Sequence, residues 1–399
     1  MATAILDIEL TNMPDEINGL YGYSHAFMLI RYKGTPIGKL TVPLIHGRLK
    51  MQQLSSTIYR SVSNQFWKAF TNDFLDYDET VISSFVSPKA SIAICTRNRT
   101  DDLRRCLDAI MLLPNNGQEV LVIDNCPSNN DTKDLVATYP SVRYIVESRP
   151  GLDVARNRAL KEASNEIVAF TDDDAVPDRN WLKALIKNFN NPLVMCVAGI
   201  TMPLELETDA QEAFERYSPF SKGFNRVVYS RETHHPLSAG RIGAGANMAL
   251  RKTVLKTVGK FDEALDAGTV TESGGDHEYF VRILLAGYQI VYEPDALNWH
   301  RHRRTHQETY KAIRGYGIGV YAFWTRLFFV EKQFEIIKFP YQWFIHNQLP
   351  NTIKSLLKRP GSQPLNLRIG ELYGCLLGPW KYLIARRRLN RKRLQHEAA

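Results

Sequence analysis

Several features that define large classes of proteins are missing from this sequence of 399 residues. Its five cysteines are scattered and form no CxxC pair, which argues against a disulfide framework and a cysteine zinc site. No apolar run reaches the roughly 18 residues that span a bilayer. The best candidate, Tyr316 to Val330, is short and contains Arg326. Because no basic segment followed by an apolar core stands at the N-terminus, we expect no signal peptide and a cytoplasmic protein.

Common nucleotide-binding and nucleic-acid-binding motifs are missing too. No GxGxxG follows the first strand expected after residue 88, so a dinucleotide fingerprint is absent. The glycine-rich stretch 240–247 (GRIGAGAN) lacks the GK[ST] of a Walker loop. It is either a mobile loop or a place where the backbone approaches a ligand closely. There is no zinc finger or RNA-recognition motif, so we expect no nucleic-acid partner.

What is present favours a large globular protein with anionic ligands. Hydrophobic residues make up 44% of the chain, which is enough for an extensive core. The formal net charge of +8 suits nucleotide diphosphates or acidic lipid surfaces. A chain of this length suits two or three domains.

Hydrophobic patterning divides the chain into three parts. In residues 1–87, two expected strands flank a turn at 33–36, and apolar residues recur every four positions over 53–70. This pattern predicts an N-terminal accessory β-rich module, followed by a linker at 84–89. Residues 88–305 alternate short apolar strands with helices, which predicts an α/β fold with a doubly wound, mostly parallel sheet. Residues 306–399 predict a helical, aromatic and basic C-terminal extension.

An acidic stretch organises the central part. The apolar run 167–170 ends in Asp172, Asp173 and Asp174. In open α/β sheets, ligands bind beyond the carboxyl ends of the strands. Three carboxylates there repel one another unless a cation lies among them, and Mg²⁺ or Mn²⁺ bridging to a diphosphate meets that need. The alternative is an acidic turn that caps the next helix.

Other polar residues fall at the same expected sheet edge. Thr96 ends the first strand of the central part and Asp124 ends the second. Asp124 would accept hydrogen bonds from a base or a ribose, and Arg156, early in a helix, would meet a phosphate. Each residue alone is a weak signal, because polar residues at strand ends are common helix N-caps. Together along one edge they favour a nucleotide site.

Six motifs in order connect the chain to a known family. They are SIAICTRNR (91–99), VLVIDNCPSN (120–129), RPGLDVARNRAL (149–160), FTDDDAVPDRNWL (170–182), GAGANMALRKTVLKTVGKFDEAL (243–265) and GGDHEYFVRILLAGYQIVYEPDALNWHRH (274–302). With these motifs the chain resembles a family 2 glycosyltransferase of the GT-A fold. The resemblance covers about half of the chain and implies a Rossmann-like sheet that binds a nucleotide sugar.

The resemblance implies roles for the matching residues on the nucleoside side. Thr96, Asn98 and Arg99 would line the nucleoside pocket. Asp124 would contact the base, and Arg156 would approach the nucleotide.

It also implies a metal site. Asp172 would face the ribose or the sugar diphosphate, and Asp174 would ligate Mg²⁺ or Mn²⁺ with it. His300 is a candidate to complete the site, although a lone histidine is as often structural. The loop that ends at Asn247 would lie beside the donor sugar and the acceptor.

The catalytic base is the third implied feature. Asp276 stands at the start of an expected helix, where a lone aspartate is most often an N-cap. In the family, the aspartate of an "ED" pair at this place is the base. Here Gly275 replaces the glutamate of that pair, but Asp276 keeps the necessary carboxylate, and Glu278 is the fallback. A single base with in-line displacement would invert the sugar.

We therefore expect an inverting, metal-dependent glycosyltransferase that moves a sugar from a nucleoside-diphosphate sugar to an acceptor hydroxyl. A glycan or lipid-linked acceptor in polysaccharide, glycolipid or cell-envelope glycan synthesis would fit. The alternative is a non-catalytic nucleotide-sugar-binding or scaffold protein that retains the fold, with Gly275 marking lost chemistry. The C-terminal helices either pack on the catalytic domain or lie peripherally on the inner face of the plasma membrane.

Overall fold

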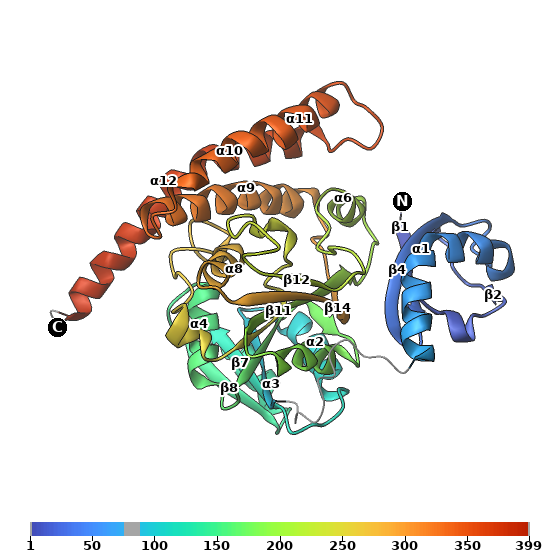
Figure 1. Cartoon of the computed structure of the whole chain (residues 1–399), viewed down its shortest axis with the longest axis horizontal. Helices are drawn as coiled ribbons and strands as arrows, with labels where there is room; N and C mark the ends of the chain where they lie inside the picture. The colour runs from blue at the N-terminus through green and yellow to red at the C-terminus, as the bar shows by residue number, and fades with distance from the viewer. Residues whose placement is uncertain (1, 76–87, 398–399) are drawn as a thin grey trace.

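The computed structural model describes residues 2–75 and 88–397. Figure 1 shows an N-terminal region beside a central α/β body, with long C-terminal helices along another side of that body. The linker predicted at 84–89 lies largely outside the described residues.

The N-terminal region is a small sheet covered by one helix. Strands β1 (Ala2–Glu9), β3 (Tyr23–Tyr32) and β4 (Thr35–Pro43) form it in the order β1-β3-β4, and α1 (Met51–Phe74) packs on it. The short strands β2 (Glu16–Ile17) and β5 (Leu49–Lys50) pair separately. The expected turn is present, because Lys33 and Gly34 between β3 and β4 both have positive φ, as a tight hairpin requires.

Strand β3 has two buried faces. Met28 and Ile30 belong to the core under α1, whereas Phe27 and Leu29 belong to the core of the central body. This alternation follows from the period of two along a strand. In addition, Arg31 in β3 pairs with Asp178 of the central body at 2.7 Å. The N-terminal region is therefore joined to the body through apolar packing and a partly buried ion pair.

One half of the nine-stranded central sheet is parallel, as predicted. Strands β8 (Val142–Glu147), β7 (Glu119–Asn125), β6 (Ala90–Thr96) and β9 (Ile167–Asp172) lie in that spatial order. The helices between them are α2 (Thr100–Met111), α3 (Asp131–Ala137) and α4 (Leu152–Glu162). The carboxyl ends of these strands meet at one edge, and Thr96 pairs in register with Asp124.

The other half mixes directions. It comprises β13 (Asn247–Arg251), β11 (Val194–Pro203), β14 (Gln289–His300), β10 (Ala175–Pro177) and β12 (Val227–Tyr229). Strands β11 and β14 are parallel, whereas β13, β10 and β12 run antiparallel to their neighbours. Ala175 pairs with His300, so the end of β14 lies beside the acidic turn that follows β9.

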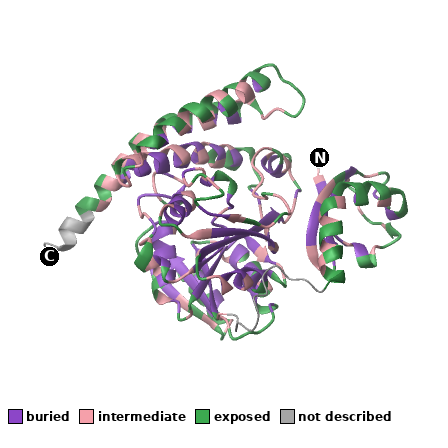
Figure 2. Ribbon diagram, in the orientation of Figure 1, coloured by how far each residue is buried: buried purple, intermediate pink, exposed green. Residues whose placement is uncertain are grey.

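Helices cover both faces of the sheet. Neighbouring residues of one strand alternate between two cores: Val168 and Phe170 belong to one, Ile167 and Ala169 to the other. Figure 2 shows this buried centre within an exposed surface. The remaining helices of the body are α5 (Trp181–Ile186), α6 (Asp209–Tyr217), α7 (Val254–Thr257) and α8 (Gly275–Leu285). Burial of each large apolar side chain contributes about 1.5–3 kcal/mol, so this double core dominates stability.

The C-terminal part is helical, as expected. It contains α9 (His306–Phe329), α10 (Lys338–Trp343), a π-helical turn (Phe344–Gln348), α11 (Leu349–Leu356) and α12 (Leu365–Glu397). Helices α9 and α12 touch backbone to backbone, because a Cβ on Gly374 would lie 2.2 Å from the carbonyl oxygen of Arg314. Among the described helices, none combines the length and the hydropathy of a membrane span.

Candidate active site

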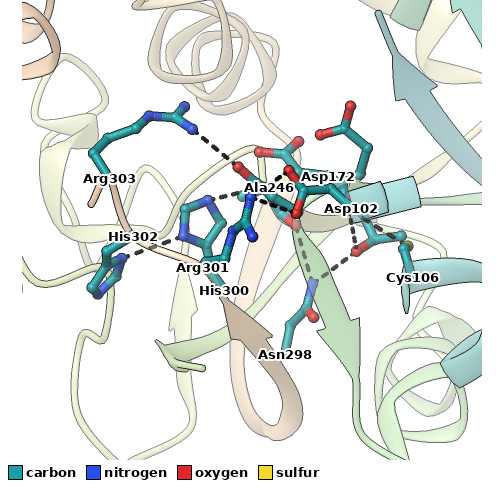
Figure 3. Close-up of polar contacts among 12 residues, drawn as sticks. Asp102, Cys106, Asp172, Ala246, Asn298, His300, Arg301, His302 and Arg303 are labelled. Carbon is teal, nitrogen blue, oxygen red and sulfur yellow. Dashed lines mark hydrogen bonds and ion pairs between the residues drawn. The ribbon is translucent and has the colours of Figure 1, made fainter. Parts of the chain in front are cut away.

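The acidic turn and the end of β14 place three ligand-type side chains together. Asp172 ends β9, Asp174 precedes β10, and the pairing of β10 with β14 sets His300 opposite Ala175. His300 Nε2 lies 3.1 Å from Asp174 Oδ1. One ligand atom from each of Asp172, Asp174 and His300 lies within 4.8 Å of the others. Figure 3 shows His300 and Arg303 pointing toward this turn.

The two aspartates of this group have opposite electrostatic environments. Burial would raise the pKa of Asp174, but His300, Arg99 and Arg303 outweigh it and hold that pKa well below the ordinary value. Arg99 Nη2 and Arg303 Nη1 lie 2.9 and 3.2 Å from Asp174 Oδ2. For Asp172, burial and then the charge of Asp174 raise the pKa. A cation placed between them would relieve this repulsion.

The residues present fit a hard divalent cation. Asp174 Oδ1 is buried, and none of the described residues offers it a well-aligned hydrogen-bond donor, so it can accept a ligand bond. Carboxylate oxygens suit Mg²⁺ and Mn²⁺, and an imidazole suits a transition metal such as Mn²⁺ better than Mg²⁺. The set Asp172, Asp174 and His300 therefore has the right donor chemistry for the metal that the sequence predicts.

Asp173, the middle aspartate, points away from this group. Its carboxylate accepts hydrogen bonds from Thr96 Oγ1 at 2.7 Å and from Arg99 Nη1 at 2.8 Å. Burial raises the pKa of Asp173 to about 7. Thr96 and Arg99, predicted for the nucleoside pocket, thus hold the acidic turn against β6 in this structure.

The other two nucleoside-pocket candidates lie along the same sheet edge. Asn98 is exposed with φ of +54° and accepts a hydrogen bond from the Ser128 N–H at 3.1 Å, which links the loops after β6 and β7. Asp124 is buried; its Oδ2 accepts from the Tyr144 hydroxyl at 2.7 Å, and its Oδ1 has no hydrogen-bond partner in the described part of the chain. Burial raises the pKa of Asp124. An unpaired acceptor at this edge is suited to a donor group on a ligand.

A cavity of about 840 Å³ lies beside the acidic turn. Its walls come from the turn, α4, the loop at 237–246, the first turn of α8, and α9 with the segment around α10. Four of the predicted residues line it together: Arg156, Asp172, Asp276 and His300. The structure thus gathers the predicted metal, phosphate and base residues around one space.

Asp276 is held as a carboxylate at the start of α8. Its Oδ2 accepts the Gly245 N–H at 2.7 Å, and its Oδ1 accepts the N–H of His277 at 2.7 Å. Burial would raise its pKa, but His277, Arg156 and these two N–H groups lower it below the ordinary value. Gly245 leaves the necessary space, because a Cβ there would lie 2.6 Å from Arg156 Nη2 and 3.0 Å from Asp276 Cβ.

A buried cluster of charged residues explains why position 275 is a glycine and not the glutamate of the expected "ED" pair. A Cβ at position 275 would lie 1.9 Å from Asp153 Oδ2, so Asp153 fills the space that a side chain there would need. Asp153 and Asp266 bind Arg156 Nη1 at 3.0 and 2.7 Å. Burial, followed by repulsion from Asp266, raises the pKa of Asp153 well above its ordinary value. Position 275 thus borders a carboxylate that comes from α4.

Sequence reasoning missed Asp153 and Asp266. The signal for Asp153 was available, since it stands three residues before Arg156 in the RPGLDVARN motif, a spacing that joins side chains on one helix face. No comparable signal marked Asp266, which reaches Arg156 from a loop 110 residues away in the chain.

Two candidates need correction. Asn247 is fully buried: its Oδ1 accepts from Trp181 Nε1 at 2.7 Å, and its Nδ2 donates to the carbonyls of Ile200 and Ala296 at 2.8 Å. With both polar atoms used inside the protein, it fixes the start of β13 and does not face the cavity. Glu278, the fallback base, is also fully buried, with both oxygens on Arg282 at 2.6 and 2.8 Å.

Comparison with known proteins finds the following similarities. Glycosyltransferase AglE of Haloferax volcanii is 27% identical over 223 residues, which are 53% of this chain and 67% of that protein. The pre-mycofactocin glycosyltransferase of Mycobacterium tuberculosis is 29% identical over 218 residues, 53% of this chain but only 43% of that relative. The solved mannosyltransferase PcManGT from Pyrobaculum calidifontis, in complex with GDP-Man and Mn²⁺, aligns over 81% of this chain and 79% of its own, with a TM-score of 0.46 and 19% identity.

The family model described as glycosyl transferase family 2 matches residues 91–259. This range includes four of the six motifs completely and most of the fifth, and it contains the acidic turn and Arg156. The resemblance predicted from the motifs is thereby confirmed: residues 91–259 of this chain match the glycosyl transferase family 2 model.

Proposed function

We propose that this protein is an inverting glycosyltransferase that uses a nucleoside-diphosphate sugar. The observation that carries the proposal is the shared cavity, where Asp172 and His300 of the acidic site face the same space as Asp276. A general base must reach the proton of the attacking hydroxyl. The cavity supplies a carboxylate and a diphosphate-type site within one volume of about 840 Å³.

Asp276 is the proposed base. Its lowered pKa keeps it ionised at neutral pH, so it can accept a proton from an acceptor hydroxyl. As that oxygen bonds to the anomeric carbon, the bond from this carbon to the diphosphate oxygen breaks, and the diphosphate leaves with the bonding electrons. Attack opposite the leaving group inverts the anomeric centre. Two N–H groups hold the carboxylate in one orientation, which favours an aligned proton transfer.

The leaving diphosphate gains negative charge, which cationic groups of the site would stabilise. Arg303 and Arg156 line the cavity as permanent cations. Asp172, Asp174 and His300 would hold Mg²⁺ or Mn²⁺, which would supply further positive charge to the diphosphate.

Metal binding can be tested without turnover. Titration of Mn²⁺, followed by its electron paramagnetic resonance signal, should show one site in the wild type and at least tenfold weaker binding in Asp174→Asn. Asp101→Asn is the matched control, since Asp101 is exposed in the first turn of α2. Equal affinity in Asp174→Asn and wild type would remove this site from the proposal.

The transfer itself is tested by incubating the protein with a panel of nucleoside-diphosphate sugars, Mn²⁺ or Mg²⁺, and glycan or lipid-linked acceptors. We expect release of the nucleoside diphosphate with at least one donor, and a product of inverted anomeric configuration by NMR. Binding of nucleotide sugars without release or transfer for any donor would favour the non-catalytic alternative. Retention of configuration would contradict the single-base mechanism.

The wider assignments are proposals too. We propose three domains: residues 1–87 as an accessory module, 88–305 as the transferase domain and 306–399 as a helical extension. We infer that the protein acts in the cytoplasm in the synthesis of a polysaccharide, glycolipid or cell-envelope glycan. The acceptor panel tests the class of acceptor.

A further inference from the structure

The C-terminal helix α12 has an apolar stripe on its solvent side. Five exposed residues lie on it at spacings of three and four, which places them on one helix face: Ile369, Tyr373, Leu376, Trp380 and Ile384. Leu376 and Trp380 are 74% and 70% exposed. A surface helix normally turns its polar residues outward, so this arrangement is the reverse of the usual one.

The neighbouring helices also expose large apolar side chains. Around α10, Phe334, Ile337 and Tyr341 are exposed, and α11 packs on α12. Exposed leucine and isoleucine residues follow on and just after α11: Leu349, Ile353, Leu356 and Leu357. Figure 2 shows exposed residues along the outer side of this helical layer. We call the exposed apolar residues of 334–357, together with the α12 stripe, the outer helical face. Large apolar patches of this kind mark interaction sites.

The charge of this segment indicates an anionic occupant. From residue 331 to residue 391 there are 11 Lys or Arg and three Glu, an excess of eight that equals the formal net charge of the whole chain, +8. Arg387 and Arg391 are exposed and extend the α12 stripe beyond Ile384 at the same spacing. Lys354, Lys358 and other exposed basic residues accompany α11.

We propose that the outer helical face binds the surface of an anionic lipid bilayer. Aromatic and aliphatic side chains would enter the headgroup region, and the basic residues would pair with lipid phosphates. A second copy of the chain fits less well, because it would bring two basic faces together. A bilayer satisfies both the apolar stripe and the positive charge.

The same layer also borders the cavity. Phe339, Trp343 and His346 line the cavity, whereas Tyr341 and Phe344 of the same stretch are exposed. This segment therefore has one side toward Asp276 and another on the outer helical face. If the proposed function holds, a lipid-linked acceptor would reach the cavity along α10 from the bilayer surface; this step rests on that function, whereas vesicle binding does not.

Vesicle flotation tests the proposal with the full-length protein. Vesicles of phosphatidylcholine with 30% phosphatidylglycerol should bind the protein, pure phosphatidylcholine should bind it at least tenfold less, and 0.5 M NaCl should weaken binding. Leu376→Ser with Trp380→Ser should reduce binding at least tenfold. The matched control is Trp67→Ser with Phe74→Ser, which removes exposed aromatics of α1 and should leave binding unchanged.

A charge variant keeps the test independent of apolar substitutions. Arg387→Glu with Arg391→Glu should abolish the preference for anionic vesicles. No binding to phosphatidylglycerol vesicles at low salt would overturn the proposal. A wild-type dimer that Leu376→Ser with Trp380→Ser converts to a monomer in light scattering would also overturn it, in favour of an interface between copies. Nucleotide and Mn²⁺ affinities measured without vesicles report separately on the proposed function.

Discussion

Gly275→Ala is the most informative single substitution for the cluster beneath Asp276. Position 275 is the first residue of α8, where alanine is normally preferred over glycine by about 1 kcal/mol. Propensity alone therefore predicts a more stable protein. The local geometry predicts the opposite, because the new Cβ would lie 1.9 Å from Asp153 Oδ2 and 2.6 Å from its Cγ.

The expected loss in the free energy of unfolding comes from the displacement of Asp153. Asp153 is fully buried and bonded to Arg156, so its displacement breaks a buried contact of 3.0 Å. Overpacking of a buried site costs about 1–3 kcal/mol. After the gain in helix propensity, we expect a net loss of about 1–2 kcal/mol in the free energy of unfolding. Because Arg156 lies near Asp276, donor turnover should fall as well.

Urea denaturation followed by circular dichroism measures this loss. Gly240→Ala is the control, since a Cβ there would meet nothing within 4 Å. In the background of Asp153→Ala the clash disappears, so Gly275→Ala should then be neutral or stabilising. If Gly275→Ala in the wild-type background is as stable as the parent protein, the reasoning about Asp153 and Gly275 is wrong.

Two further predictions concern residues outside the cavity. Burial would raise the pKa of Glu119, but hydrogen bonds from Ser164, Ser91 and Arg143 hold it below the ordinary value. The stability that Glu119 contributes is therefore present above its unfolded pKa of about 4.3 and is lost as pH falls through the lower folded pKa. Glu119→Gln should therefore flatten the acid side of a curve of Tm against pH. An unchanged curve would contradict this expectation. Trp181→Phe should cost about 1–3 kcal/mol in thermal denaturation, because it removes the hydrogen bond that Asn247 Oδ1 accepts inside the core. A cost below about 0.5 kcal/mol would contradict this expectation.

The parallel half of the sheet could be predicted because its signals are local. Each apolar run such as 120–123 is followed by a turn and an amphipathic helix, and right-handed crossovers then leave few arrangements. The pairing of β10 with β14 could not be predicted in this way. Strand β10 has three residues, and it is tertiary pairing with a strand more than 100 residues away that brings His300 to Asp174.

The site residues also divide into those that the sequence indicated and those that it could not. The acidic residues after a strand indicated Asp172 and Asp174, and the family resemblance indicated Asp276, because residue type and order are visible in a sequence. The direction of a side chain is not visible there. Asn247 follows a glycine-rich loop that resembles a ligand contact, yet its amide turns inward to Trp181. The motif spacing could have paired Asp153 with Arg156, but the contact of Asp153 with position 275 arises from tertiary packing that the sequence does not show.

Asp276→Asn separates donor binding from turnover and so tests whether Asp276 is the base. We expect this variant to bind the nucleotide sugar and Mn²⁺ within about threefold of the wild type, while kcat for transfer falls by about 10²–10⁴-fold, the usual contribution of a positioned general base. Asp101→Asn should change neither quantity. Turnover of Asp276→Asn within a few-fold of the wild type, with folding and donor binding intact, would contradict the assignment of Asp276 as the base.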